Sequence, residues 1–181
     1  MNSSIIIFSG AGGSTIYLNY TSYMPVEIVA FLIISFIGLY VCITDYTQRR
    51  INNNAVLCVF ILLSAIAIFH DKYISGLVLA ISVIFIGYVL FVVKVLGAGD
   101  VKLVAAFAPA LTWSGVVVGL FGMCVLGGLL AAGYLLYGVC SGRLKEVRQR
   151  GIPYGIPIVI SFLTVLYFQL DIGNQFQSLM M

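Results

Sequence analysis

The chain has 181 residues, of which 62% are hydrophobic and only 8% are charged, and its net charge is +3. Soluble domains are about 45–50% apolar and about 25% charged, so this composition excludes a soluble globular enzyme, and its hydrophobicity excludes a disordered chain. What remains is a membrane protein with several spans, because one span needs about 20 apolar residues and the chain has length for no more than about six or seven.

Six apolar runs follow one another and predict an all-α, polytopic membrane bundle of six transmembrane helices. Backbone polar groups in lipid must pair within a helix or a closed barrel, and the period-two alternation of a barrel is missing. The fourth run is short and contains Pro109, which favours a tilted or partly re-entrant helix. The runs are 26–44, 55–69, 74–93, 101–112, 115–139 and 156–170; they lie in a membrane domain over 26–170, between outer tails at 1–25 and 171–181.

The basic residues predict the orientation of the bundle. If the first run ends in the cytosol, eight of the nine basic residues lie on the cytosolic side and only Lys72 lies opposite. The positive-inside rule therefore predicts an N-out/C-out topology, and aromatic residues such as Tyr73 and Trp113 fall near the predicted outer ends. The eight residues are Arg49, Arg50, Lys94, Lys102, Arg143, Lys145, Arg148 and Arg150.

Small residues in the fifth run predict close helix packing. Gly115 and Gly119 form a GxxxG pair, and Gly128 with Ala132 repeats the spacing. Packing within the bundle is one interpretation, and a dimer contact through this helix is the other. The cysteines lack CxxC pairs and lie in or beside apolar runs, which is typical of small packing residues rather than of a metal site or a disulfide framework: Cys42, Cys58, Cys124 and Cys140.

Two of the six carboxylates occupy unusual positions. Asp45 ends the first run and Asp100 begins the fourth, so the predicted topology puts both at the same depth on the cytosolic side. Two close carboxylates share one proton, and aspartic proteases use such a pair to activate a water and polarise a carbonyl, with no metal or other cofactor. The alternative is that Asp45 and Asp100 are only charged residues at the membrane interface, with no catalytic role. We expect His70 on the opposite side and solvated surface positions for the other carboxylates: Glu27, Asp71, Glu146 and Asp171.

Two glycines stand directly before the second aspartate. Gly97 and Gly99 permit a backbone with positive φ and add no side-chain bulk. A substrate segment could therefore approach the Asp100 carboxylate closely, along a loop formed by these glycines.

Three motifs resemble one known family. The stretch 97–100 resembles the GxGD signature of intramembrane aspartyl proteases, and 101–103 resembles the type IV prepilin peptidases in particular. The segment 45–53 resembles that family's first catalytic aspartate, its basic pair and its Ile-Pro-Asn-like turn, with Asn52 at the usual proline position. The segment 152–157 resembles the family's motif before its last helix.

The resemblance covers residues 26–170 and implies a peptidase of the prokaryotic cytoplasmic membrane. Its substrate would be a prepilin with a short basic leader, cleaved after a glycine that precedes an apolar helix, and Asp45 and Asp100 would be catalytic. Lys102 stands two positions after Asp100, so we expect it on another side of the helix. The possible contacts to substrate or lipid headgroups are Arg49, Arg50 and Lys102.

Within the family, long members carry an insert with paired CxxC motifs and also methylate the new pilin N-terminus. This chain has no CxxC and resembles the short TadV/CpaA-like type linked to Flp or tight-adherence pili, so methyltransferase activity is not expected. The implied partners are a prepilin and the lipid bilayer, not nucleic acid. The alternatives are a GxGD peptidase with a preflagellin-like substrate, a structural subunit of pilus assembly, and a proton-coupled transporter. A transporter would need carboxylates near the bilayer midplane, which the runs lack.

Overall fold

The computed structural model describes residues 24–146 and 151–172, and every regular element in these ranges is helical. The helices are α1 (Met24–Gln48), α2 (Asn53–Phe69), α3 (Tyr73–Val92), α4 (Ala98–Phe107), the short 3₁₀ helix η2 (Ala108–Ala110), α5 (Trp113–Cys140) and α7 (Gly155–Gln169). The predicted tails, apart from 24–25 and 171–172, lie outside the described residues, as do Arg148 and Arg150. Each predicted apolar run thus contains a helix, which confirms the all-α fold class.

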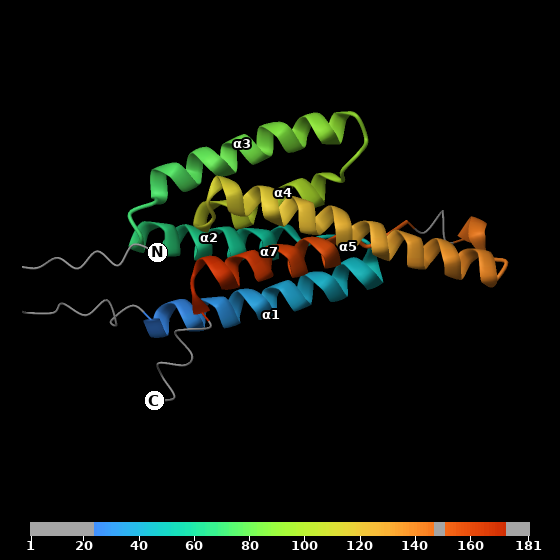
Figure 1. Ribbon diagram of the computed structural model, residues 1–181, viewed down its shortest axis with the longest axis horizontal. Coiled ribbons are helices and arrows are strands. Elements are labelled where there is room, and N and C mark those ends of the chain that lie inside the picture. Colours follow the sequence, from blue (N-terminus) through green and yellow to red (C-terminus); the bar gives the residue numbers. More distant parts are fainter. Residues whose placement is uncertain (1–23, 147–150, 173–181) are drawn as a thin grey trace, which may run out of the picture.

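Successive helices alternate in direction along one bundle axis (Figure 1). As a result, α1 begins and α7 ends at the same end of the bundle, on the left in Figure 1. The opposite end gathers the C-terminal ends of α1 and α3 with the first turns of α2, α4 and α7, and the C-terminal part of α5 projects beyond it. We call this end the site end, because it brings the residues after α1 close to those before α4.

Three helices have the length and composition of membrane spans: α1, α3 and α5. The apolar helices α2 and α7 are shorter, with 17 and 15 residues. The exteriors of the long helices carry many exposed Ile, Leu, Val and Phe side chains, as the outer surface of a membrane bundle does. The structure therefore supports a membrane protein, while the count of six spans and their orientation stay predictions.

The fourth run differs most from its prediction, because α4 has only 10 residues. At 1.5 Å per residue it is about 15 Å long, half of the hydrocarbon thickness of about 30 Å. Pro109 ends the α-helical segment in η2, and its backbone carbonyl packs against Gly76 of α3. The side chains from Leu103 to Ala108 are almost fully buried, so α4 is a short central helix rather than a peripheral span.

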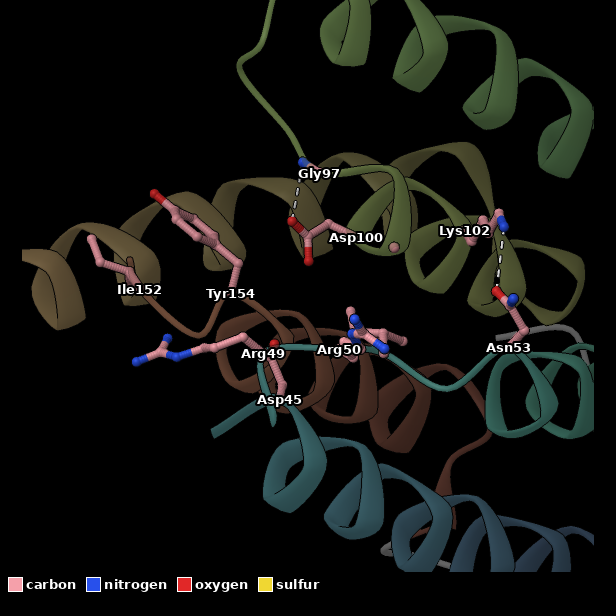
Figure 2. Close-up of a pocket in the computed structure, with 11 residues that line it drawn as sticks. Asp45, Arg49, Arg50, Asn53, Gly97, Asp100, Lys102, Ile152 and Tyr154 are labelled. Carbon is pink, nitrogen blue, oxygen red and sulfur yellow. Dashed lines mark hydrogen bonds between the residues drawn. The ribbon is translucent and has the colours of Figure 1, made fainter. Parts of the chain in front are cut away.

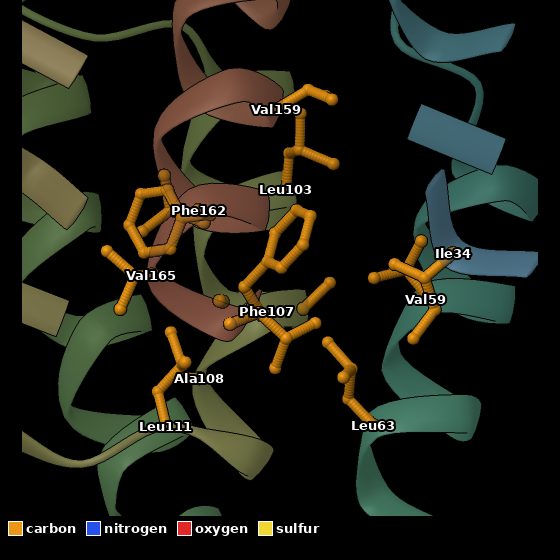
Figure 3. Packing of buried hydrophobic residues seen from close by; sticks show 14 of the residues in the cluster. Ile34, Val59, Leu63, Leu103, Phe107, Ala108, Leu111, Val159, Phe162 and Val165 are labelled. Atoms are coloured by element: carbon orange, nitrogen blue, oxygen red, sulfur yellow. The ribbon is translucent and has the colours of Figure 1, made fainter. Parts of the chain in front are cut away.

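The core around α4 fixes the position of its first turn. The rings of Phe107 in α4 and Phe162 in α7 lie 5.6 Å apart, and both side chains are fully buried. Figure 3 shows them among side chains from the surrounding helices, including Ile34 of α1 and Leu63 of α2. Because a close-packed core resists displacement, α4 holds a fixed place between α2 and α7.

The GxxxG pair of α5 packs within the chain. A Cβ added at Gly119 would lie 2.8 Å from the Phe162 ring, and one at Gly115 would overlap Gln169 of α7. The second small pair, Gly128 and Ala132, is exposed. The first pair therefore serves the α5–α7 contact, as the packing interpretation predicts.

Two expectations about side chains were wrong. Glu27 is not solvated: it is 8% exposed, and its Oε1 lies 2.7 Å from Nε2 of His70, so the pair joins α1 to the end of α2. The cysteines are free thiols, but Cys58, Cys124 and Cys140 are exposed on the bundle exterior and do not fill its core. The polarity of the neighbouring sequence did not predict the burial of these side chains. Packing between helices determined it.

Candidate active site

The two boundary aspartates line one cavity at the site end. Asp45 stands in the last turn of α1 and Asp100 in the first turn of α4, 55 positions later in the chain. The cavity has a volume of about 450 Å³, and Figure 2 shows the two carboxyl groups on opposite sides of it, turned toward the space between them. The other lining residues are Arg49, Arg50, Ile51, Asn53, Gly97, Gly99, Lys102, Ile152 and Tyr154.

The Asp45 carboxylate is buried and held by the backbone of another helix. Its side chain belongs to a residue that is 7% exposed, and its Oδ2 accepts a hydrogen bond of 2.7 Å from the N–H of Gly155. Gly155 is the first residue of α7, whose leading N–H groups have no partner within the helix. The contact therefore supplies a donor to a carboxylate that burial would otherwise disfavour.

The Asp100 carboxyl group has different surroundings. It is half-buried, and its Oδ2 accepts a hydrogen bond of 3.2 Å from the N–H of Gly97, the residue that caps α4. The pKa of Asp100 is raised to about 6: burial disfavours its charged form, the Gly97 hydrogen bond partly opposes this, and the negative charge of Asp45 raises the pKa further. The Asp45 charge thus acts on the Asp100 carboxyl group across the cavity, as a smaller influence than burial.

The glycines before Asp100 serve close packing and not unusual backbone angles. Gly97 has a φ of −75°, and neither it nor Gly99 is among the described residues with positive φ. Gly97 caps α4 and Gly99 lies in its first turn, so the predicted loop is wrong for Gly99. A Cβ at Gly97 would lie 2.9 Å from Oδ2 of Asp100, and one at Gly99 would lie 3.3 Å from Ile51. The missing side chains therefore leave room for the carboxyl group and for the segment after α1.

The segment after α1 brings its basic pair to the same cavity. Arg49 directly follows α1 with a φ of 56°, and its Nε and Nη1 are buried without a hydrogen-bond partner among the described residues. Arg50 is exposed on the cavity rim. Asn52, which stands at the family's usual proline position, caps α2 by accepting a hydrogen bond of 3.0 Å from the N–H of Asn54. A side-chain cap thus defines the turn here.

Lys102 also lines the cavity, contrary to the expectation that it lies elsewhere on the helix. Its Nζ lies 3.3 Å from Oδ1 of Asn53 and donates a hydrogen bond to it, and Figure 2 shows this pair at the far side of the cavity from Asp45. The cavity spans more than one face of α4, which helical spacing alone does not reveal.

The sequence-based prediction missed the contributions of 151–155. Ile152 and Tyr154 line the cavity, and Gly155 binds Asp45, although no role was predicted for any of them. The signal is the family-like motif 152–157, which by itself indicates only the approach to the last helix.

The arrangement suits acid–base chemistry with water. Two carboxyl groups in unequal environments face one cavity that is large enough for water. Unequal environments allow one carboxyl group to be ionised while the other holds a proton. Three cations on the lining would attract negative charge that develops there. Among the described residues no three His, Cys, Asp or Glu side chains gather in a way that could hold a metal ion.

A known protein family matches the chain. The sequence model of the type IV leader peptidase family matches residues 31–132, which is more than half of the chain. This range includes both aspartates and ends within α5. No curated protein and no solved structure matches the chain significantly.

Proposed function

The chain belongs to the type IV leader peptidase family, and we propose that it is a membrane-embedded aspartic endopeptidase that removes the short leader of Flp-like type IV prepilins. The observation that carries this proposal is the shared cavity of Asp45 and Asp100, with the charge of one affecting the pKa of the other. Two unrelated surface charges would not be expected to line one cavity or to affect each other's pKa.

In the proposed reaction the two carboxyl groups activate one water between them. One is ionised and accepts a proton from the water, whose oxygen attacks the scissile carbonyl carbon; the other is protonated and donates to the carbonyl oxygen. The raised pKa of Asp100 favours it as the proton donor. No metal or cofactor takes part.

The substrate fits the cavity by shape and charge. Gly97 and Gly99 line the cavity beside Asp100, where an extended segment would lie, and Arg49 has unpaired N–H donors for its backbone carbonyls. The cations on the lining would repel a basic leader, so we propose that the leader stays outside the cavity while the neutral junction enters it. The apolar helix of the prepilin would then lie in the bilayer.

We place the cavity at the cytosolic face of a prokaryotic cytoplasmic membrane. The described basic residues support this, because Arg49, Arg50, Lys94 and Lys102 belong to the site end, whereas Lys72 lies at the other end. At this face the peptidase would meet a prepilin whose leader is still in the cytosol.

The test is cleavage of a co-expressed Flp-type prepilin by the wild type and by Asp45→Asn and Asp100→Asn variants. Each change keeps the shape of the side chain and removes its acid–base function, so we expect a loss of about 10²–10⁴-fold in cleavage rate. Asp71→Asn is the matched control, because Asp71 is exposed at the opposite end. Normal cleavage by either active-site variant contradicts the proposal, and cleavage of a preflagellin but not of a prepilin would favour the alternative substrate.

A further inference from the structure

The first residue of α7 contacts the catalytic centre although it lies 110 positions after Asp45. We propose that Gly155 is a positioning residue: its backbone N–H keeps Asp45 ionised and oriented, which makes Asp45 the general base and Asp100 the general acid. This inference rests on the proposed function, and it assigns each aspartate a separate role.

The hydrogen bond itself is short and shielded. Gly155 N and Asp45 Oδ2 are 2.7 Å apart, and both residues are buried. Bonds between an N–H and a charged carboxylate are shorter and stronger than bonds between neutral groups. The bond that Asp100 receives from Gly97 is longer, at 3.2 Å, and more exposed. The two carboxyl groups are therefore supported unequally.

Helix electrostatics strengthen this difference. Asp45 lies three residues before the end of α1, where the unpaired carbonyls disfavour a negative charge. The N-terminus of α7 carries the opposite partial charge and points its first N–H at Asp45. The N-terminus of α7 thus offsets the unfavourable effect of the α1 C-terminus on the Asp45 charge. Asp45 acquires this support only when α7 packs against α1.

The need for glycine at position 155 follows from space. A Cβ there would lie 2.9 Å from Oδ2 and 3.2 Å from Cγ of Asp45. Gly155 is not among the described residues with positive φ, so other residue types could adopt its backbone conformation. Any larger residue must push the carboxylate away from its donor.

Other ionisable groups also act on Asp45, and the experiment must separate them from Gly155. Cys42 interacts with Asp45 along α1, and the remaining ionisable groups line the shared cavity: Arg49, Arg50, Asp100, Lys102 and Tyr154. A change at the backbone of residue 155 leaves all of these side chains in place.

With these roles the proton balance closes over one turnover. Water gives a proton to Asp45 and its oxygen bonds to the carbonyl carbon, while Asp100 gives its proton to the carbonyl oxygen. Asp45 then passes its proton to the amide nitrogen as the C–N bond breaks, and a hydroxyl of the tetrahedral intermediate returns a proton to Asp100. The products are the free leader acid and the new amine, and both aspartates regain their starting states.

The sharpest test replaces residue 155 with glycolic acid during translation, which exchanges the N–H for an ester oxygen and adds no volume. A carbodiimide that reacts with protonated carboxyl groups then reports the proton on each aspartate by mass spectrometry. In the wild type near pH 6 we expect Asp100 to be modified and Asp45 to be spared. In the ester variant, modification of Asp45 should rise about tenfold or more, because the lost bond favoured its charged form.

Cleavage provides the second measurement. The ester variant should lose activity at the acidic end of the pH profile first, since protonation of the base then begins at higher pH. Gly155→Ala should lower the cleavage rate about tenfold or more by displacing Asp45. Gly38→Ala is the matched control, because its Cβ would lie 2.8 Å from Val159 of the same helix α7, while Gly38 itself precedes Asp45 by two turns of α1, about 10 Å. We expect it to retain cleavage per folded molecule.

The outcomes separate the two proposals. Equal modification of both aspartates in the wild type, or an ester variant with unchanged Asp45 modification and an unchanged pH profile, overturns the role of Gly155. Carbodiimide modification needs no substrate, so it can support that role even if no prepilin is cleaved. Failure of the peptidase proposal would instead appear as normal cleavage by the Asp→Asn variants.

Discussion

Asp45 and Asp100 show how one residue type acquires two chemical environments. Asp45 is buried against the first N–H of α7, and Asp100 is half-buried and bonded to the residue that caps its own helix. The longer bond leaves burial as the largest influence on Asp100, and its pKa rises to about 6. The pair can therefore hold a single proton at near-neutral pH.

We predict that cleavage depends on the proton of Asp100. Because its pKa is about 6, the protonated fraction falls as pH rises through that value, and kcat/KM should fall about tenfold per pH unit above it. The measurement is prepilin cleavage in detergent or liposomes between about pH 5 and about pH 8.5. A rate that stays constant across this range would contradict a proton-donating Asp100.

The same group links stability to pH with a definite sign. The carboxyl has a pKa of about 6 in the folded protein against 3.8 as a reference, so the folded state binds the proton more strongly. Its stabilising contribution is complete below pH 3.8 and is lost as pH rises through about 6. The melting temperature of Asp100→Asn should accordingly exceed that of the wild type at pH 8 and approach it at about pH 5.

At the scale of elements, the glycines of α5 differ in what surrounds them. Gly115, Gly119 and Gly122 face α7, where an added Cβ would meet Gln169, Phe162 or Ser161. Gly128 and Gly133 have no neighbouring atom within 4 Å of such a Cβ. The glycines that face α7 let the two helices approach closely, and this contact supports the helix whose first residue binds Asp45.

We predict that Gly119→Val destabilises the bundle while Gly133→Val does not. The added side chain at position 119 would overlap the Phe162 ring in the core, at a cost of about 1–3 kcal/mol. Position 133 offers open space on the same helix and serves as the matched control. Thermal unfolding of the purified variants in detergent measures the difference. Equal melting temperatures would show that the α5–α7 contact tolerates the larger side chain.

At the scale of the molecule, alternating helices bring distant segments to one end. The site end collects residues from the end of α1 and the segment after it, from the starts of α2 and α4 and from the segment before α7, and these form the cavity (Figure 1, Figure 2). Glu27 and His70 form a separate pair at the opposite end. The cavity and the Glu27–His70 pair are thus separated along the bundle axis.

We predict that thiol labelling will distinguish the two ends in the membrane. In a background with all native cysteines replaced by alanine, Lys72→Cys should react with an impermeant maleimide in intact spheroplasts. Lys145→Cys should react only after the membrane is permeabilised, because the positive-inside rule puts its loop in the cytosol. Both residues are exposed, so burial does not limit either reaction. The reverse pattern would contradict the N-out/C-out topology.

Much of the fold and part of the site could be predicted from local patterns. Apolar runs fixed where helices form, because in lipid a helix satisfies its own backbone. Asp45 and Asp100 could be placed at helix ends because they stand at the ends of apolar runs. The structure brings both to one cavity. Their catalytic role remains a prediction, supported by the family to which the chain belongs.

Only the tertiary structure decided which residues meet. The shortness and burial of α4, the burial of Glu27 and the contact from Gly155 to Asp45 all depend on helices that are far apart in the chain. The amino-acid sequence by itself determined the helices, the charge asymmetry and the acidic residues at helix ends, since these follow from composition and short-range periodicity. Packing between helices determined which carboxylate gains a buried donor and which gains a raised pKa, because solvation and hydrogen bonding depend on neighbours in space.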